Sequence, residues 1–438
     1  MRRAPLAALV LAGGAGALTG GDMAFGQSLS GATLSATLAE RFEVNDNYNL
    51  DDPSPGTSYF ADTLLSLGLL NETDTQSFGL GIDTGLRALW QAEEPFEFTV
   101  ASPTSANLDY SNEWANGLFD MAFDYRQREV DATQNGVDDN GAPSPLDQLS
   151  NNSREMRYDA NIGVLFGTST PSTYELRFIG SQIDYSDTTP NQVARTTLQG
   201  QAAWNLQLNP VLASRVTGDY LTYSADNTGE TELDRGQVGA GVVYTPNENL
   251  TVGGALNYAE RKRTDLVGGS RETTQDDSGP GVSADFNYVL PDFVLSGEGE
   301  WTTAAPENRF FGVVRATYAL PRGRIGARLF QNYIGASDGS DEARVTGVAL
   351  QVVRDINLVS SFGVDFAYAT QVDVSDVLGD PTSPDIRRID VTATYSHALT
   401  ESVSADIGYA YRNRDEDPSN AASNAVFFQI GKTFETRP

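Results

Sequence analysis

The strongest constraint on the fold is an alternation of apolar and polar residues with a period of two, which recurs from about Ala32 to the C-terminus. In 77–90, one set of alternate residues includes Leu80 and Ile82, whereas the other includes Asp83 and Arg87. Side chains alternate between the two faces of a β-strand. Each such segment therefore reads as a strand with one apolar and one polar face.

The same alternation recurs in 118–129, and carrying it through the chain predicts an even number of strands. The twenty predicted strands are 32–46, 58–70, 76–90, 105–115, 118–129, 154–167, 173–185, 194–208, 212–223, 232–244, 250–261, 281–290, 293–303, 309–320, 324–334, 344–354, 358–370, 386–396, 402–413 and 423–434.

The predicted connections alternate in length. Short ones are 71–75, 116–117, 168–172, 209–210, 245–249, 291–292, 321–323, 355–357 and 397–401. Longer, acidic ones include Asn47 to Thr57, Val130 to Asn152, Lys262 to Pro280 and Gln371 to Asp385. Asn116-Gly117 is a hairpin dipeptide that readily takes the left-handed conformation. The alternation predicts an all-β, transmembrane, antiparallel up-and-down barrel of eighteen to twenty strands, with short turns and both termini in the periplasm.

The first 26 residues have the three regions of a secretory signal: Arg2 and Arg3, an apolar stretch from Leu6 to Leu18, and a small-residue cleavage site at Ala24-Phe25-Gly26. The alternative is an uncleaved anchor, but the apolar stretch is too short to span a bilayer. The prediction is a signal peptide over 1–26 and a single barrel domain over 27–438. No later stretch approaches eighteen consecutive apolar residues, which argues against membrane helices.

Charge and cysteine content narrow the chemistry. The formal charge is −30, and the signal contributes +1, so the mature chain stands at −31. Such a surplus argues against nucleic acid as a partner. The chain has no cysteine, so an exported form contains neither disulfides nor a thiol nucleophile.

Aromatic placement is a separate indication, because membrane barrels concentrate Trp and Tyr at the headgroup level. All four tryptophans have the apolar parity near strand ends: Trp90, Trp114, Trp204 and Trp301. The predicted outer girdle contains Tyr125, Tyr258 and Tyr368, and the inner one contains Tyr244, Tyr288, Tyr318 and Tyr395.

Over residues 30 to 438 the sequence resembles the outer-membrane β-barrel porins of Gram-negative bacteria, a loosely defined family of mostly uncharacterised members. The final strand is similar to the terminal signal read by the barrel assembly machinery, with Gln429, Gly431 and Phe434 in the matching positions. Thr436 stands where that pattern has a second aromatic residue. The resemblance implies outer-membrane localisation and contact with lipid and lipopolysaccharide.

Two features of the sequence resemble chemical sites, but a structural or solvated role is favoured for each. His397 is the only histidine and falls in a predicted turn, and no Gly-x-Ser-x-Gly elbow accompanies it, so a polar interfacial role is favoured over a catalytic triad. The acidic run from Asp131 to Gly141 has oxygen ligands but not the spacing of an EF-hand. A solvated loop is favoured there, with weak divalent binding that bridges to lipopolysaccharide as the alternative. No catalytic residue, metal or cofactor is predicted.

The polar parity predicts a water-lined lumen with balanced charge. The lumen-lining candidates are Asp83, Arg87, Asp120, Asp124, Arg126, Arg128, Arg157, Asp159, Arg177, Arg195, Arg235, Arg315, Arg328 and Asp390. Seven arginines should lie toward the extracellular end: Arg128, Arg157, Arg195, Arg235, Arg261, Arg388 and Arg412. They either pair with nearby carboxylates, which is the favoured interpretation, or form a collar that attracts an acidic saccharide. Arg and Asp on facing walls would instead orient polar solutes.

The predicted function is a non-enzymatic, porin-like channel for passive diffusion of small hydrophilic solutes, with acidic loops that enrich cations at the outer mouth. One alternative is an export pore for an acidic exopolysaccharide, and another is a structural barrel plugged by its own loops. Val130 to Asn152 is the leading plug by length. Self-association of barrels is left open.

Overall fold

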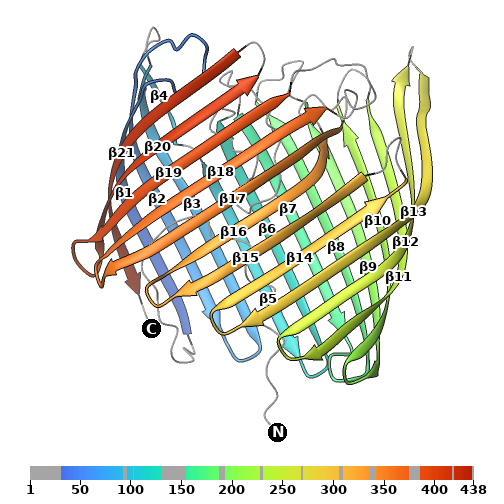
Figure 1. The fold of residues 1–438 in the computed structure, drawn as a ribbon. Helices are drawn as coiled ribbons and strands as arrows, with labels where there is room; N and C mark the ends of the chain where they lie inside the picture. The colour runs from blue at the N-terminus through green and yellow to red at the C-terminus, as the bar shows by residue number, and fades with distance from the viewer. Residues whose placement is uncertain are drawn as a thin grey trace.

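The computed structural model of the chain describes residues 31–91, 96–101, 103–129, 154–186, 193–226, 230–267, 270–304, 309–335, 342–373, 385–416 and 419–436. Within these ranges the chain forms one closed sheet (Figure 1). Its strands are β1 (Gly31–Asn45), β2 (Ser58–Glu72), β3 (Gln76–Trp90), β4 (Glu97–Val100), β5 (Thr104–Trp114), β6 (Gly117–Glu129), β7 (Arg154–Phe166), β8 (Ser172–Tyr185), β9 (Arg195–Asn209), β10 (Leu212–Ala225), β11 (Glu232–Asn247), β12 (Leu250–Val267), β13 (Ser270–Leu290), β14 (Phe293–Thr302), β15 (Arg309–Leu320), β16 (Gly323–Gly335), β17 (Glu342–Asn357), β18 (Ser360–Asp373), β19 (Ile386–Ala398), β20 (Val403–Glu416) and β21 (Ser419–Thr436).

The sheet closes because the first and last strands pair. β1 and β21 run antiparallel from Leu34 opposite Thr436 to Asn45 opposite Ala425. β4 and β5 both pair with β3 and share one place in the ring, so the barrel has twenty strand positions. The predicted twenty-strand antiparallel barrel is confirmed. Among the described residues, no helix has the length and hydropathy to cross a bilayer.

The predicted strand over 105–115 is present as β5, but β4, which shares its place in the ring, is not predicted from the sequence. Ile82 pairs with Ala106 and Leu86 pairs with Val100, so the β4–β5 side holds two more residues than the facing part of β3. Pro103 lies in the break between the two strands and has no N–H to give to the ladder. Because the insertion is even, Phe98 and Val100 stay on the same face as Leu108.

Short and long connections separate onto opposite rims. We call the end that carries the short connections, such as 73–75 and 210–211, the turn rim, and the opposite end the loop rim. β1 begins and β21 ends at the turn rim (Figure 1).

Two turns at this rim differ in backbone geometry. The turn at Ala115-Asn116 corrects one expectation, because Asn116 and Gly117 are not among the described residues with positive φ. Asn116 instead stabilises the neighbouring turn between β7 and β8. Its Oδ1 accepts hydrogen bonds from the Ser169 backbone N (3.2 Å) and from the Ser169 Oγ (2.7 Å). Gly167 has φ +83°, and a Cβ there would lie 2.0 Å from the Ser172 carbonyl oxygen, so this turn does require glycine.

The largest correction concerns Lys262 to Pro280, predicted as a loop. This stretch continues β12 and β13 as a hairpin that rises above neighbouring strands (Figure 1), with pairing from Glu260–Ser278 to Val267–Ser270. A register shift falls between Arg263 and Thr264. Beyond the rim both faces of the hairpin can be polar, so the alternation that identified the other strands is missing. Two other strands also extend further toward the loop rim than predicted: β18 continues to Asp373, and β21 begins at Ser419.

The outer face of the barrel is apolar all round. On β1, Leu34, Leu38 and Phe42 are 52%, 48% and 54% exposed, and register carries the same face to Phe428 on β21 and Leu65 on β2. The four tryptophans are all exposed on this face. Large exposed apolar side chains in a continuous belt are what a hydrocarbon surrounding selects.

The inner face differs between its two ends. Near the loop rim, Phe330, Val345, Ala369 and Ile386 form a buried apolar cluster, and Val345 is fully buried. Nearer the turn rim, inward residues such as Arg324 and Asp109 are exposed. Inward side chains are therefore closely packed toward the loop rim and more accessible to solvent toward the turn rim.

Candidate functional site: the inner wall

The inner wall is the set of alternate residues whose side chains point away from the apolar outer face. Register places every predicted lumen residue on it: Asp83 and Arg87 on β3, Asp120, Asp124, Arg126 and Arg128 on β6, Arg157 and Asp159 on β7, Arg177 on β8, Arg195 on β9, Arg235 on β11, Arg315 on β15, Arg328 on β16 and Asp390 on β19.

Several arginines near the loop rim are neutralised by a carboxylate two residues along the same strand. The ion pairs are Arg41–Glu43 (2.7 Å), Arg157–Asp159 (2.7 Å), Arg263–Asp265 (3.0 Å), Arg388–Asp390 (2.9 Å) and Arg414–Glu416 (2.7 Å). Residues i and i+2 of a strand share one face, so this spacing suits a long guanidinium side chain and a short acid.

Two further pairs join neighbouring strands and use acids that sequence reasoning missed. Arg87 donates from Nε and Nη2 to Asp62 at 2.8 and 3.0 Å, and Arg128 lies 2.7 Å from Glu155. Asp62 and Glu155 are 3% and 2% exposed. Charges this deeply buried are stable only with a hydrogen-bonded partner. The short turn at 73–75 fixes the register of β2 and β3, so the pairing of Asp62 with Arg87 could have been predicted from the sequence. No short turn connects β6 to β7, so the pairing of Glu155 with Arg128 could not.

The rest of the predicted collar is also engaged. Arg235 lies 3.2 Å from Asp219, Arg412 lies 4.0 Å from Asp390, and Arg261 donates to Gln275 Oε1 at 3.1 Å. Arg195 is buried and is also engaged in an interaction. The structure therefore brings the seven arginines to the loop half but holds most of them against nearby acceptors.

Like charges lie opposite each other where β6 meets β7. Asp124 faces Asp159, and two residues further along Arg126 faces Arg157. Like charges directly opposite on a sheet repel. Here the pair of aspartates lies directly beside the pair of arginines, and the 2.7 Å contact between Arg157 and Asp159 joins the two pairs. The result is a chequered patch of charge on one wall of the lumen.

Contacts loosen toward the turn rim. Arg177 reaches Asp120 at 3.3 Å and Glu175 at 3.5 Å, whereas Arg315 lies 3.9 Å from Glu298 with side chains 50% and 67% exposed. Pairs so open to water contribute little to stability. Their charges remain available to solutes.

Acid and base also occupy facing walls. β6 carries Asp120 and Asp124, and β16 carries Arg324 and Arg328. Counted around the twenty-position ring, these two strands lie ten places apart in either direction, so they face each other across the lumen. Between them a polar solute would meet opposite charges on its two sides.

The pKa of one carboxyl group at the hairpin, Asp265, is lowered by its surroundings. Burial acts to raise the pKa of Asp265, but hydrogen bonds from Thr274 and Thr231 and the charge of Arg263 outweigh it, so the pKa lies below its usual value. Asp265 is therefore ionised at neutral pH and joins the base of the hairpin to the β11 side through Thr231, whose Oγ1 donates at 2.8 Å.

His397 lies at the end of β19 rather than in the turn predicted for it. Its Nδ1 is 2.7 Å from Ser360 Oγ, to which the Tyr395 hydroxyl donates at 3.1 Å. The sequence pattern alone does not identify Ser360 as a partner of His397. In the part of the chain that the structure describes, no carboxylate contacts this histidine. The arrangement has neither the third member of a triad nor a place on the inner wall.

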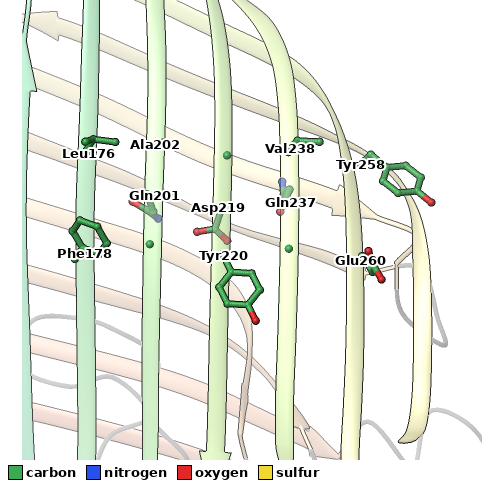
Figure 2. A pocket seen from close by; sticks show the side chains of 13 residues that line it. Leu176, Phe178, Gln201, Ala202, Asp219, Tyr220, Gln237, Val238, Tyr258 and Glu260 are labelled. Atoms are coloured by element: carbon green, nitrogen blue, oxygen red, sulfur yellow. The ribbon is translucent and has the colours of Figure 1, made fainter.

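A groove of about 570 Å³ crosses the outer wall over β8 to β12 (Figure 2). Its floor is Gly200, Gly218 and Gly236, and no atom lies within 4 Å of a Cβ placed at Gly218. Tyr220 and Val238, which border it, are 55% and 64% exposed. Because the groove opens on the apolar face, polar solutes in the lumen do not reach it.

Two predicted features, the acidic run Asp131 to Gly141 and the plug Val130 to Asn152, lie outside the described residues. Within the residues that are described, no group of three or more histidine, aspartate or glutamate side chains is placed to hold a metal ion.

The chain matches no family model, and no curated protein matches its sequence. Similar solved structures include the ferric-catecholate import receptor Fiu of E. coli K12, at 8% identity and a TM-score of 0.48 over 93% of this chain and 82% of that one. OccAB2 of Acinetobacter baumannii has 10% identity and a TM-score of 0.37 over 93% and 98%. OpdQ of Pseudomonas aeruginosa has 9% and 0.34 over 92% and 99%. At these identities and TM-scores nothing about function follows from the likeness.

Proposed function

We propose that this chain is an outer-membrane channel through which small hydrophilic solutes diffuse passively. The observation that carries the proposal is the contrast between the two faces of one closed wall. Outside, Leu34, Phe42 and Phe123 are about half exposed; inside, the same strands present serine, asparagine, aspartate and arginine. A closed barrel satisfies every backbone group in hydrocarbon, and barrels of sixteen to eighteen strands already enclose water.

The facing charges support a role in handling polar solutes. Asp120 and Asp124 on one wall and Arg324 and Arg328 on the other create a field across the lumen, and water is the only medium in which such walls are inexpensive. A solute that carries a dipole would align with that field as it passes.

The arginine geometry disfavours export of an acidic polysaccharide. Such a polymer needs cationic groups that are free to bind, whereas Arg157, Arg388 and Arg128 each lie within 3 Å of a carboxylate. Breaking such a partly buried pair leaves one charge uncompensated, which costs several kcal/mol.

A second candidate, a barrel closed by protein in its loop half, is favoured by one observation. Inward residues near the loop rim are buried, including Val345 at 0% and Arg388 at 3%. A structural or adhesive barrel would have the same outer face but no continuous water path.

Orientation and assembly follow the same proposal. Both ends of the barrel wall lie at the turn rim, which we place in the periplasm. Phe434, on the outer face of β21 and 53% exposed, together with Gln429 and Gly431, would be read by the barrel assembly machinery. Lipopolysaccharide would surround the loop rim, and self-association of barrels stays a proposal.

Planar-bilayer conductance of the purified, detergent-extracted protein tests the proposal, and liposome swelling in small sugars checks it for uncharged solutes. Stepwise channels together with swelling are expected. Absence of both in correctly folded protein would leave the closed barrel as the function.

A further inference from the structure

We propose that the channel prefers cations, and that four carboxylates between the middle of its wall and the turn rim, Asp83, Asp109, Asp365 and Asp406, determine this preference. The inference rests on the proposed channel function and names the class of solute it passes. These carboxylates lie on β3, β5, β18 and β20, on either side of the β1–β21 seam, three to seven residues from the turn-rim ends of their strands.

These four acids keep their charge uncompensated. In the described part of the chain no ion pair joins any of them to a cationic side chain. Their recorded partners are neutral: Ser105 Oγ donates to Asp83 at 3.1 Å, Asn107 Nδ2 to Asp109 at 3.1 Å and Gln351 Nε2 to Asp365 at 2.9 Å. A neutral donor fixes the position of a carboxylate and leaves its field in the lumen.

Most arginines of the inner wall lie in the loop half. The loop-half arginines are held by their acids, as in Arg388–Asp390 and Arg414–Glu416. In the turn half, Arg177, Arg215 and Arg315 are also within 4 Å of carboxylates. Among the described residues, the other inward arginines there, Arg324 and Arg328, lie together on β16, so they offset only part of the field of four acids that are distributed over four other strands.

The charge of the four carboxylates acts on permeating ions. Asp109 and Asp365 are exposed to solvent, and a water-filled passage with low-dielectric walls concentrates counter-ions along its axis. Potassium should therefore permeate on the order of ten times more readily than chloride at low salt. The four carboxylates differ in location from the acidic outer mouth expected from the sequence, because they line the inside of the barrel wall and do not belong to the loops.

The test is the reversal potential of single channels under a tenfold gradient of potassium chloride. The wild type should be cation-selective, and the quadruple variant D83N/D109N/D365N/D406N should lose most of that selectivity while it still conducts. The matched control, D184N/D234N/D276N/D415N, makes the same change of charge at the outer face around the loop rim, and it should stay selective.

A second measurement needs only the wild type. Raising the salt from about 0.1 M to 1 M shortens the screening length from about 10 Å to 3 Å, so selectivity should fall toward unity. The inference would be overturned if the wild type favoured chloride or neither ion. It would also be overturned if the quadruple variant were as selective as the wild type, or if the control variant lost selectivity to the same extent. No conductance at all would instead overturn the proposed function.

Discussion

At the scale of single residues, buried charge on the inner wall is arranged in pairs. Arg87 both donates to Asp62 and lies over the Phe60 ring at 5.0 Å, and the Tyr48 hydroxyl accepts a further hydrogen bond from it at 3.4 Å. The side chains of Arg87 and Asp62 are 11% and 4% exposed. Neither charged group is solvated well enough to be stable if its partner is removed.

We therefore expect Asp62→Asn to destabilise the folded barrel by about 3 kcal/mol, because Arg87 is left without a counter-charge. The measurement is the temperature or denaturant concentration at which heat-modifiable gel mobility is lost. Adding Arg87→Gln to the same chain should restore part of the loss, since no buried charge then remains. An unchanged midpoint for Asp62→Asn would show that this pair is not needed for stability.

How far such partners were predictable depends on the connection between the strands. Asp62 and Arg87 belong to a hairpin whose turn is three residues long, so the register could have been written down from sequence. Glu155 and Arg128 also face each other, but 26 residues separate them, and the pattern alone sets no register over that distance. His397 and Ser360 belong to adjacent strands, and the loop that connects these strands is also too long to set their register from the sequence.

At the scale of elements, the segment 47–57 between β1 and β2 bridges the seam of the barrel. Asn47 donates from Nδ2 to the Asp51 and Ala422 carbonyl oxygens at 2.9 and 3.0 Å, and its Oδ1 accepts from the Asp51 backbone N at 3.0 Å. Tyr48 packs on Phe60 with ring centroids 4.6 Å apart. The segment thereby links β21 to β2 across the end of β1.

Replacing Asn47 with alanine should remove these three hydrogen bonds from a residue that is 3% exposed. Each buried group left without a partner costs about 1–3 kcal/mol. The barrel should unfold at a lower temperature, and heat-modifiable mobility is again the readout. Ser54→Ala is the matched control, because Ser54 hydrogen-bonds in the same segment but is exposed. Equal midpoints for the two variants would contradict a bridging role.

The β12–β13 hairpin was the element least visible in the sequence. Its outer part, rich in Thr, Gln, Asp and Ser, lies beyond the apolar belt, so neither face needs hydrocarbon side chains and the period-two pattern is lost. What holds it is polar, since Arg263 and Thr231 converge on Asp265 and Arg271 pairs with Glu230 at 3.5 Å. The twenty strands within the belt, by contrast, followed from alternation alone.

This hairpin should loosen in acid. The pKa of Asp265 is lower in the folded chain than its ordinary value, so its contribution is complete above about pH 4 and is lost as the pH falls through the folded pKa. A nitroxide at Glu272→Cys, specific because the chain has no cysteine, should gain mobility in that range. In an Asp265→Asn background the label should be mobile at every pH; a label that is equally rigid there would remove Asp265 as the cause.

At the scale of the whole molecule, one wall separates two solvents, and register makes the separation testable at single positions. Leu108 and Ser111 are close in sequence on β5 and fall on opposite faces. In liposomes, a membrane-impermeant thiol reagent should modify Ser111→Cys and leave Leu108→Cys unmodified. Leu80→Cys and Phe123→Cys, on the outer face of neighbouring strands, should behave as Leu108→Cys does. Rapid modification of all four positions would mean that no hydrocarbon covers the outside.

The pairing of β1 with β21 also has a temporal consequence. Thr37 and Thr433, which share a hydrogen bond across it, stand 396 positions apart. Contacts so distant in the chain form late, and until then the first strand presents a row of unmatched amides and carbonyls that any extended polypeptide could adopt as a template. A nascent chain of this design thus depends on protection in transit, and the step that ends its vulnerability is the arrival of its own last strand.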